Sequence, residues 1–161
     1  MRASDLQSDL PVVRRDTTAL DAARLIAATH LAGLVVADDS GTPLAVVSAV
    51  DVLALMLPGY LLDDVSLAGV FDERAAEELW GHAGDHSIGE LLDDEHVHVN
   101  DLLKVDADAT IVEVAALMID ARAQVALVRG EPGAPAMFLT LSTVMDAILT
   151  FCAPLDGPPT A

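Results

Sequence analysis

The chain has 161 residues, of which 53% are hydrophobic and only 3% are aromatic. This length and apolar content suffice for one compact domain, or for two small halves that share a core. The 26 acidic and 8 basic residues give a formal charge of −18, which repels phosphate backbones and anionic lipid headgroups. We therefore expect no nucleic acid among the partners of this protein, and no insertion into a membrane.

The apolar segments are short. The longest, VDVLALMLPGYLL, is interrupted by Pro58 and Gly59, whereas a membrane-spanning helix needs about 20 apolar residues. The N-terminal sequence MRASDLQSDLP lacks the apolar stretch of a secretion signal. The single cysteine, Cys152, excludes an intrachain disulfide. Together these features favour a cytoplasmic protein.

The first half of the chain predicts a strand, a helix, two strands joined by a turn, and a second helix. We expect the first strand at about residues 12–14, followed by a helix that Asp16 or Thr17 caps. The segments LVVAD and LAVVS predict two strands, and DSGTP between them is a turn by composition. A second helix is expected over residues 49–57, where Pro58 and Gly59 end it.

The second half of the chain repeats this pattern at an offset of 92 residues, which is the spacing between Ser48 and Thr140. The same offset aligns Thr18 with Thr110 and Gly41 with Gly133. In this copy LLKVD, VALVR and AMFLT predict strands, and helices are expected over about residues 110–121 and 141–152. Because both copies alternate strands and helices, the expected fold class is α/β or α+β.

An acidic segment rich in histidine separates the two copies. Within it, Asp63 or Asp64 and then Asp72 are suited to cap short helices. The predicted organisation is a first repeat over residues 1–59, a helical insertion over 60–100, a second repeat over 101–153 and a flexible tail over 154–161.

The segment DTTALDAARLIAATHLAGLVVADDSGTPLAVVSAVDVL resembles the cystathionine-beta-synthase (CBS) domain, whose paired form is called a Bateman module. The similarity lies in the order of helix, strand, glycine turn and strand, and in a closing Gly-x-x-Ser/Thr-x-x-Asp signature. It extends over nearly the whole chain apart from the insertion and the tail. The resemblance implies two pseudo-symmetric β-α-β-β-α repeats that pack through their sheets and form two clefts, which often bind adenosine-containing ligands.

Carried onto this sequence, the signature implies that Asp51 holds the ribose hydroxyls and that Ser48 lies near the ribose or phosphate. A carboxylate is suited to this because it can accept from both hydroxyls. Ala45 replaces the usual glycine of the signature. A purely structural interpretation is compatible with this one: Ser48 caps the helix that follows, and Asp51 lies favourably in its first turn.

The second copy departs further from the signature. Its equivalent segment is MFLTLST, in which Met137 stands for glycine and Thr143 for the acid, so that only Thr140 remains as an implied contact of the ribose or phosphate. We therefore expect at most one adenosine site of this type.

The resemblance also implies the rest of the ligand site. Adenine would contact Ala45 and residues of the second copy, and basic residues at the ends of the first helices, His30 and Arg122, would meet phosphate. The helix dipole is an alternative reason for a basic residue at each of those helix ends. The implied adenine contacts in the second copy are Leu103, Lys104, Val105 and Val125.

The charge of the chain bears on the choice of ligand. A polyphosphate would be repelled by a protein of charge −18. AMP, adenosine or S-adenosylmethionine is therefore expected in preference to ATP, unless magnesium accompanies ATP.

The histidines of the insertion suggest a metal site. His82 and His86 are four residues apart, and His96 and His98 follow; such a pair can chelate zinc when it lies on one helix. However, Gly81, Gly84 and Gly89 make this stretch a poor helix. A solvated connector is the expected interpretation, and a metal sensor is the alternative.

No catalytic motif is present, so we expect no enzyme activity and no required cofactor. The leading hypothesis is a cytoplasmic regulatory module that binds an adenosine-type ligand. We expect it to form a homodimer through the apolar helices over residues 49–57 and 141–152. The rival hypothesis is a dimerising scaffold without a ligand, which regulates a separately encoded transporter or enzyme.

Overall fold

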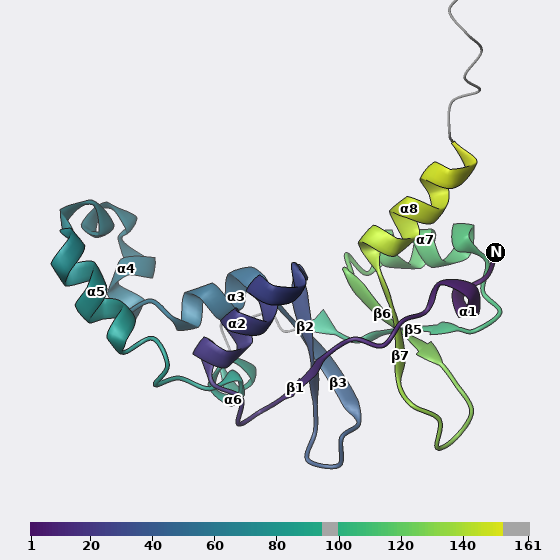
Figure 1. Cartoon of the computed structure of the whole chain (residues 1–161), viewed down its shortest axis with the longest axis horizontal. Helices are drawn as coiled ribbons and strands as arrows, with labels where there is room; N and C mark the ends of the chain where they lie inside the picture. Colours follow the sequence, from purple (N-terminus) through teal and green to yellow (C-terminus); the bar gives the residue numbers. More distant parts are fainter. Residues whose placement is uncertain (95–99, 153–161) are drawn as a thin grey trace, which may run out of the picture. The chain divides into compact units, whose positions relative to one another are not determined.

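A computed structural model describes residues 1–94 and 100–152, and the chain forms two units (Figure 1). The first unit is Pro11–Leu102, and the second combines Met1–Leu10 with the chain from Leu103 onward. Both units mix helices with a small sheet, which confirms the predicted fold class. No helix in the described ranges is long and apolar enough to cross a membrane.

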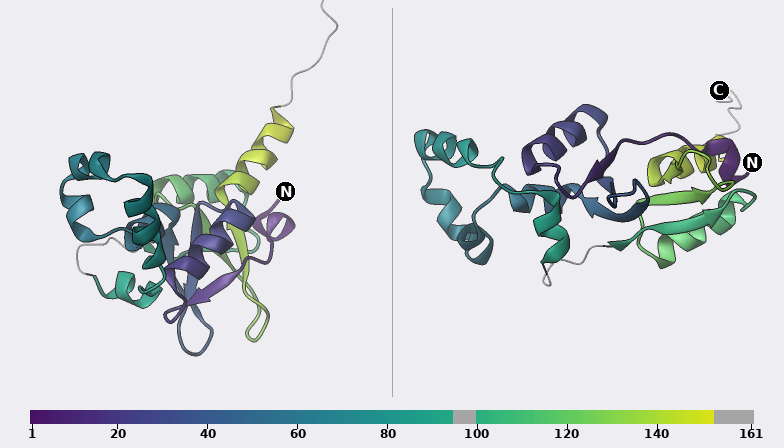
Figure 2. Two further views of the ribbon diagram at one scale, coloured as in Figure 1. Left: turned by 60° about the vertical axis from the view of Figure 1, so that its left-hand side comes forward. Right: turned by 90° about the horizontal axis from the view of Figure 1, so that it is seen from below.

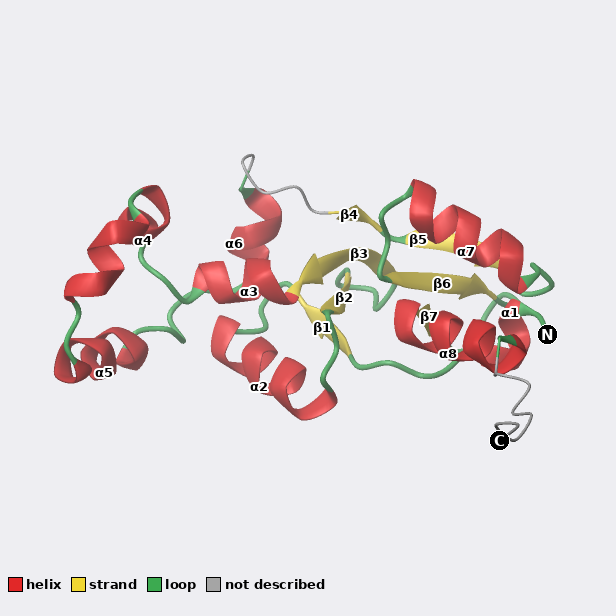
Figure 3. Ribbon diagram, turned by 90° about the horizontal axis from the view of Figure 1, so that it is seen from above, coloured by secondary structure: helices red, strands yellow, loops and turns green. Residues whose placement is uncertain are grey.

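The first unit is built on a four-stranded sheet in the order β1-β2-β3-β4. β2 is parallel to β1 and antiparallel to β3, and it is buried along its whole length. Helices α2 and α3 lie side by side next to this sheet (Figure 3). Its elements are β1 (Val12–Arg14), α2 (Ala19–Thr29), β2 (Gly33–Ala37), β3 (Pro43–Ser48), α3 (Ala49–Leu55) and β4 (Asn100–Asp101).

The second unit has a three-stranded sheet in the order β5-β6-β7, with β6 parallel to β5 and antiparallel to β7. The loops that join β2 to β3 and β6 to β7 project beyond their strands (Figure 2). Its elements are α1 (Ala3–Leu6), β5 (Leu103–Asp106), α7 (Ile111–Asp120), β6 (Val125–Arg129), β7 (Met137–Thr140) and α8 (Leu141–Phe151).

Equivalent positions of the two repeats share unusual backbone geometry. Gly41 and Gly133 have φ of 87° and 86°, and they provide the left-handed residue in the turn of each β-hairpin. Thr18 and Thr110 both cap the first helix of their repeat through the side-chain oxygen. The repeat offset is thus confirmed in three dimensions. The prediction that Asp16 or Thr17 caps the first helix is wrong, because Thr18 Oγ1 accepts from Asp21 N at 3.1 Å.

The N-terminal segment does not follow the predicted boundary, which assigned residues 1–59 to the first repeat. Ala3 is fully buried in the core of the second unit, where its backbone N–H donates to the Ala109 carbonyl at 3.0 Å. Ser8 forms a β-bridge with Phe138. These contacts join the first ten residues to the second unit.

The insertion contains α4 (Gly59–Asp63), a 3-10 helix η1 (Val65–Val70), α5 (Glu73–Gly81) and α6 (Ile88–Asp93). Asp64 and Asp72 cap η1 and α5 as predicted, and α4 and α5 stand apart from β1–β3 (Figure 1). By contrast, α6 belongs to the core of the first unit, in which Ile88 is fully buried. Within the predicted insertion over 60–100, α6 and β4 thus belong to the first unit, in which β4 pairs with β3.

Candidate functional site

Ser48 and Asp51 form a reciprocal pair where β3 passes into α3. The Asp51 backbone N–H donates to Ser48 Oγ at 3.1 Å. In return, Asp51 Oδ2 accepts from the Ser48 hydroxyl at 2.5 Å and from the Ser48 backbone N–H at 3.2 Å. This capping box confirms the predicted structural role of both residues. It leaves Oδ1 of the half-buried Asp51 without a hydrogen bond to any described residue.

Gly33 lies directly opposite Ser48 in the β2–β3 ladder. A Cβ atom at this position would be 2.8 Å from the Val47 carbonyl oxygen and 3.5 Å from Ser48 Cα. Gly33 is itself buried, and glycine is required here because a side chain would collide with the backbone of the neighbouring strand. The sequence did not predict this role of Gly33, whose equivalent in the second copy is Val125.

The second unit places Thr140 and Thr143 where the first has Ser48 and Asp51. Thr140 Oγ1 accepts from Thr143 N at 3.1 Å, and the two hydroxyls are 2.8 Å apart. The hydroxyl of Thr143 thus replaces the carboxylate in the cap. Val125 pairs with Thr140, and these two residues are only 3% and 8% exposed. This unit therefore lacks the acid, and it has a side chain where the first unit has Gly33.

His30 and Arg122 lie at equivalent positions just after α2 and α7. Both adopt left-handed backbone conformations, with φ of 54° and 48°, and both are exposed. After His30, the Ala32 carbonyl accepts from Ala49 N at 2.8 Å, which ties this connection to the start of α3. The backbone of His30 therefore lies near the end of the sheet at which Ser48 lies. The side chains of His30 and Arg122 make no ion pair within residues 1–94 and 100–152.

The residues expected to contact adenine do not share one sheet face. Leu103 and Val105 pack in the core of the second unit. Since side chains alternate along a strand, Lys104 lies on the other face of β5, where it is exposed, and Val125 lies on that face of β6. In the first unit, Ala45 is nearly buried and lies on the opposite face of β3 from Ser48.

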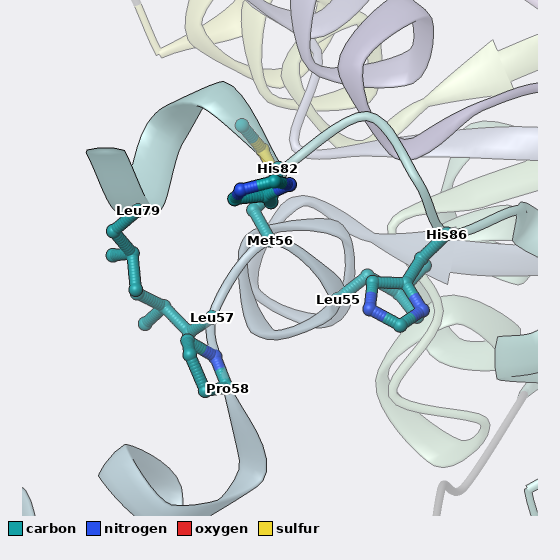
Figure 4. Close-up of a pocket in the computed structure, with 7 residues that line it drawn as sticks. All are labelled: Leu55, Met56, Leu57, Pro58, Leu79, His82 and His86. Carbon is teal, nitrogen blue, oxygen red and sulfur yellow. The ribbon is translucent and has the colours of Figure 1, made fainter. Parts of the chain in front are cut away.

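His82 and His86 line one apolar hollow, together with Leu55, Leu57 and Leu79 (Figure 4). Each histidine has its own acidic neighbour: His82 Nδ1 is 3.4 Å from Asp85 and His86 Nδ1 is 2.7 Å from Glu90. The hydrogen bond with His86 holds the pKa of Glu90 below its ordinary value. The described residues contain no group of three potential metal ligands, and His96 and His98 lie outside them.

Two other carboxyl groups have lowered pKa values, and both belong to turns or caps. The Ser40 hydroxyl and the Thr42 backbone N–H lower the pKa of Asp38, and the Ser66 hydroxyl and backbone N–H lower that of Asp64. These shifts mark local hydrogen bonding in exposed turns. They do not indicate an acid–base catalyst.

Comparison with known proteins gives one family. The profile of the CBS domain matches residues 3–58. The crystal structure of a CBS domain-containing protein of unknown function from Kribbella flavida DSM 17836 is 30% identical, with a TM-score of 0.74, over 92% of this chain and 99% of that one. No curated protein has a significantly similar sequence.

More distant structures share the fold. CBSX2 of Arabidopsis thaliana, in complex with AMP, is 24% identical with a TM-score of 0.61, over 94% of this chain and 98% of its own. Hypoxic Response Protein I, with two coordinated zinc ions, is 17% identical with a TM-score of 0.56. The match covers 91% of this chain and 98% of that protein. With its duplicated β-α-β-β-α units and this similarity over almost its whole length, the chain belongs to the family of CBS-domain proteins and is a tandem CBS pair.

Proposed function

We propose that this CBS pair is a non-catalytic regulatory module that binds an adenosine-containing ligand at Asp51. The single observation that carries the proposal is the geometry of this carboxylate. Ser48 fixes it through Oδ2 at the start of α3, and no described residue bonds to Oδ1. A carboxylate oxygen held in this way is suited to accept from ribose hydroxyls. The complex of CBSX2 with AMP supports the same class of ligand.

The proposal assigns one such site to the chain. Thr143 supplies a hydroxyl where Asp51 supplies a carboxylate, and Val125 adds a side chain where Gly33 has none. A hydroxyl can accept from the ribose but has no negative charge to strengthen both bonds. Ligand contact by Thr140, and by the predicted adenine residues Ala45, Leu103, Lys104, Val105 and Val125, stays a prediction.

The proposed ligand is AMP, adenosine or S-adenosylmethionine in preference to ATP. His30 and Arg122 are exposed and follow equivalent helices of the two repeats, and the family resemblance implies phosphate contact for both. A triphosphate would face a chain of charge −18. Magnesium would be needed to offset that repulsion.

Calorimetric titration of the wild-type chain and of Asp51→Ala with AMP, ATP and S-adenosylmethionine tests the proposal. We expect binding of at least one ligand by the wild type, with a stoichiometry of one per chain. Binding should weaken at least about tenfold in Asp51→Ala, because a hydrogen bond to a charged group contributes about 1.5–3 kcal/mol. No binding of any of the three ligands by the folded wild type would contradict the proposal.

The rival function is a dimerising scaffold that regulates a separately encoded transporter or enzyme without a ligand. Exposed apolar side chains on the second helix of each repeat favour it: Val50 and Leu53 on α3, and Met145, Leu149 and Phe151 on α8. Homodimerisation is compatible with both functions. Sedimentation equilibrium of the wild type and of Val50→Asp and Leu149→Asp would show whether these faces join two copies.

A further inference from the structure

The helices α4, η1 and α5 form an apolar hollow that the adenosine hypothesis does not use. Its volume is about 270 Å³, and its lining includes Leu57, Leu61, Phe71, Leu79 and Trp80. The hollow of about 210 Å³ that His82 and His86 line also includes Leu57 and Leu79, so the two adjoin. We call these two hollows, which share Leu57 and Leu79, the groove.

The same elements carry further exposed apolar side chains. Five further large apolar residues of α4 and η1 are 39–80% exposed, and Trp80, the only tryptophan of the chain, is 47% exposed. Several large apolar side chains exposed on one short stretch of chain are typical of a contact with a protein. The five residues are Tyr60, Leu62, Val65, Leu67 and Val70.

The charges around the groove indicate that a partner would be basic. Residues 59–81 contain six acidic side chains and one basic one. Arg74 pairs with Glu78 at 3.5 Å, whereas the described residues provide no ion pair or hydrogen bond for the side chains of Glu73 and Glu77. These two carboxylates are therefore available to cations of a partner.

The helical spacing of α5 places these carboxylates beside the groove. Ala76, Leu79 and Trp80 face the groove at i, i+3 and i+4. Glu73 precedes Ala76 by three residues and Glu77 precedes Trp80 by three, so both lie on the adjacent row. The floor of the groove is thus apolar and this edge is negative.

We infer that this groove binds a basic amphipathic helix of another protein, with apolar anchors on the groove floor and Lys or Arg against Glu73 and Glu77. A second copy of this chain would bring a like-charged surface to the same edge, which disfavours it. The C-terminal segment PLDGPPTA carries no basic residue and so lacks the matching charge. This binding is independent of the adenosine ligand.

A titration of the full chain with model peptides, read from Trp80 fluorescence, tests the inference. The probe is an amphipathic Leu/Lys peptide of about 14 residues, or four helical turns. We expect it to bind and to shift the Trp80 emission to the blue. An Ala/Lys peptide of equal charge, which lacks the apolar anchors, and a Leu/Glu peptide of the same pattern should bind much more weakly.

Two double variants, each of which removes two negative charges, distinguish binding at Glu73 and Glu77 from general attraction to an acidic protein. Glu73→Gln with Glu77→Gln should weaken binding of the Leu/Lys peptide roughly threefold to tenfold at low salt. Glu113→Gln with Asp120→Asn, on the exposed surface of α7, should change it less than about twofold. All four side chains are exposed, so neither variant removes a core contact.

Three results would overturn the inference. Equal weakening by both double variants would show general attraction to an acidic protein, and equal binding of the Ala/Lys peptide would show that the groove contributes nothing. A blue shift of Trp80 that rises with protein concentration alone would show that a second copy covers the groove.

Discussion

Replacing Asp51 separates the structural role of this residue from its proposed role in ligand binding. Asp51→Ala removes the two hydrogen bonds that Oδ2 accepts from Ser48, at 2.5 and 3.2 Å, but keeps the bond from the backbone of residue 51 to Ser48 Oγ. It also removes a negative charge from the first turn of α3, where the helix dipole favours it. From these partly exposed interactions we expect a loss of about 1.5 kcal/mol in the free energy of unfolding.

The second repeat provides the matched control for this change. Asp51→Thr reproduces the pair Thr140–Thr143, whose hydroxyls are 2.8 Å apart, and so it should retain a side-chain contact with Ser48. We expect this variant to lose about half as much stability as Asp51→Ala, roughly 0.7 kcal/mol. Urea denaturation followed by far-UV circular dichroism measures both. Equal stability of Asp51→Ala and the wild type would refute this account of the capping box.

Three further predictions concern other positions of the two repeats. Gly41→Ala should lower the free energy of unfolding by about 1 kcal/mol in urea denaturation, because φ at Gly41 is 87° while a Cβ atom would meet nothing within 4 Å. A loss no larger than that of Gly69→Ala, where a Cβ atom also meets nothing within 4 Å but φ is not positive, would refute it. Asp38 has a lowered pKa in the folded chain, so its contribution to stability is present above the ordinary value of 3.8 and is lost as the pH falls through the folded value. The difference in melting temperature between the wild type and Asp38→Ala should therefore shrink below pH 3.8, and a constant difference would contradict the assignment. Ala3→Asp should destabilise the second unit in thermal unfolding, since a charge would replace a fully buried side chain, whereas Ser4→Asp at an exposed neighbour should have little effect.

The repeat was predictable because it depends on local chemistry. Thr110, Gly41, Gly133, Ser48 and Thr140 each perform a task, capping a helix or turning a hairpin, that their residue types indicate without any tertiary contact. The same patterns therefore identified the order of strands and helices, and they placed the Ser48–Asp51 cap at the junction where the structure has it.

Features that depend on distant contacts could not be predicted in this way. The first ten residues join the second unit through hydrogen bonds such as Ala3 N to the Ala109 carbonyl, which no local pattern reveals. Ile88 packs in the core of the first unit, and the backbone N–H of Gly89 donates to the Arg15 carbonyl at 2.7 Å, although the two partners are more than 70 positions apart. Glycine is required at position 33 because a Cβ atom would lie 2.8 Å from the Val47 carbonyl oxygen of the neighbouring strand, which the residues around Gly33 in the sequence do not reveal.

The most direct test of the central claim is a calorimetric titration with AMP of the wild type, Asp51→Thr and Thr143→Ala. The account predicts one site per chain in the wild type, binding weakened at least about tenfold in Asp51→Thr, and unchanged affinity and stoichiometry in Thr143→Ala. Both variants alter the same structural position in the two repeats, and neither removes the Ser48 or Thr140 hydroxyl. Equal affinity of the wild type and Asp51→Thr for AMP would contradict the claim that the Asp51 carboxylate holds the ligand.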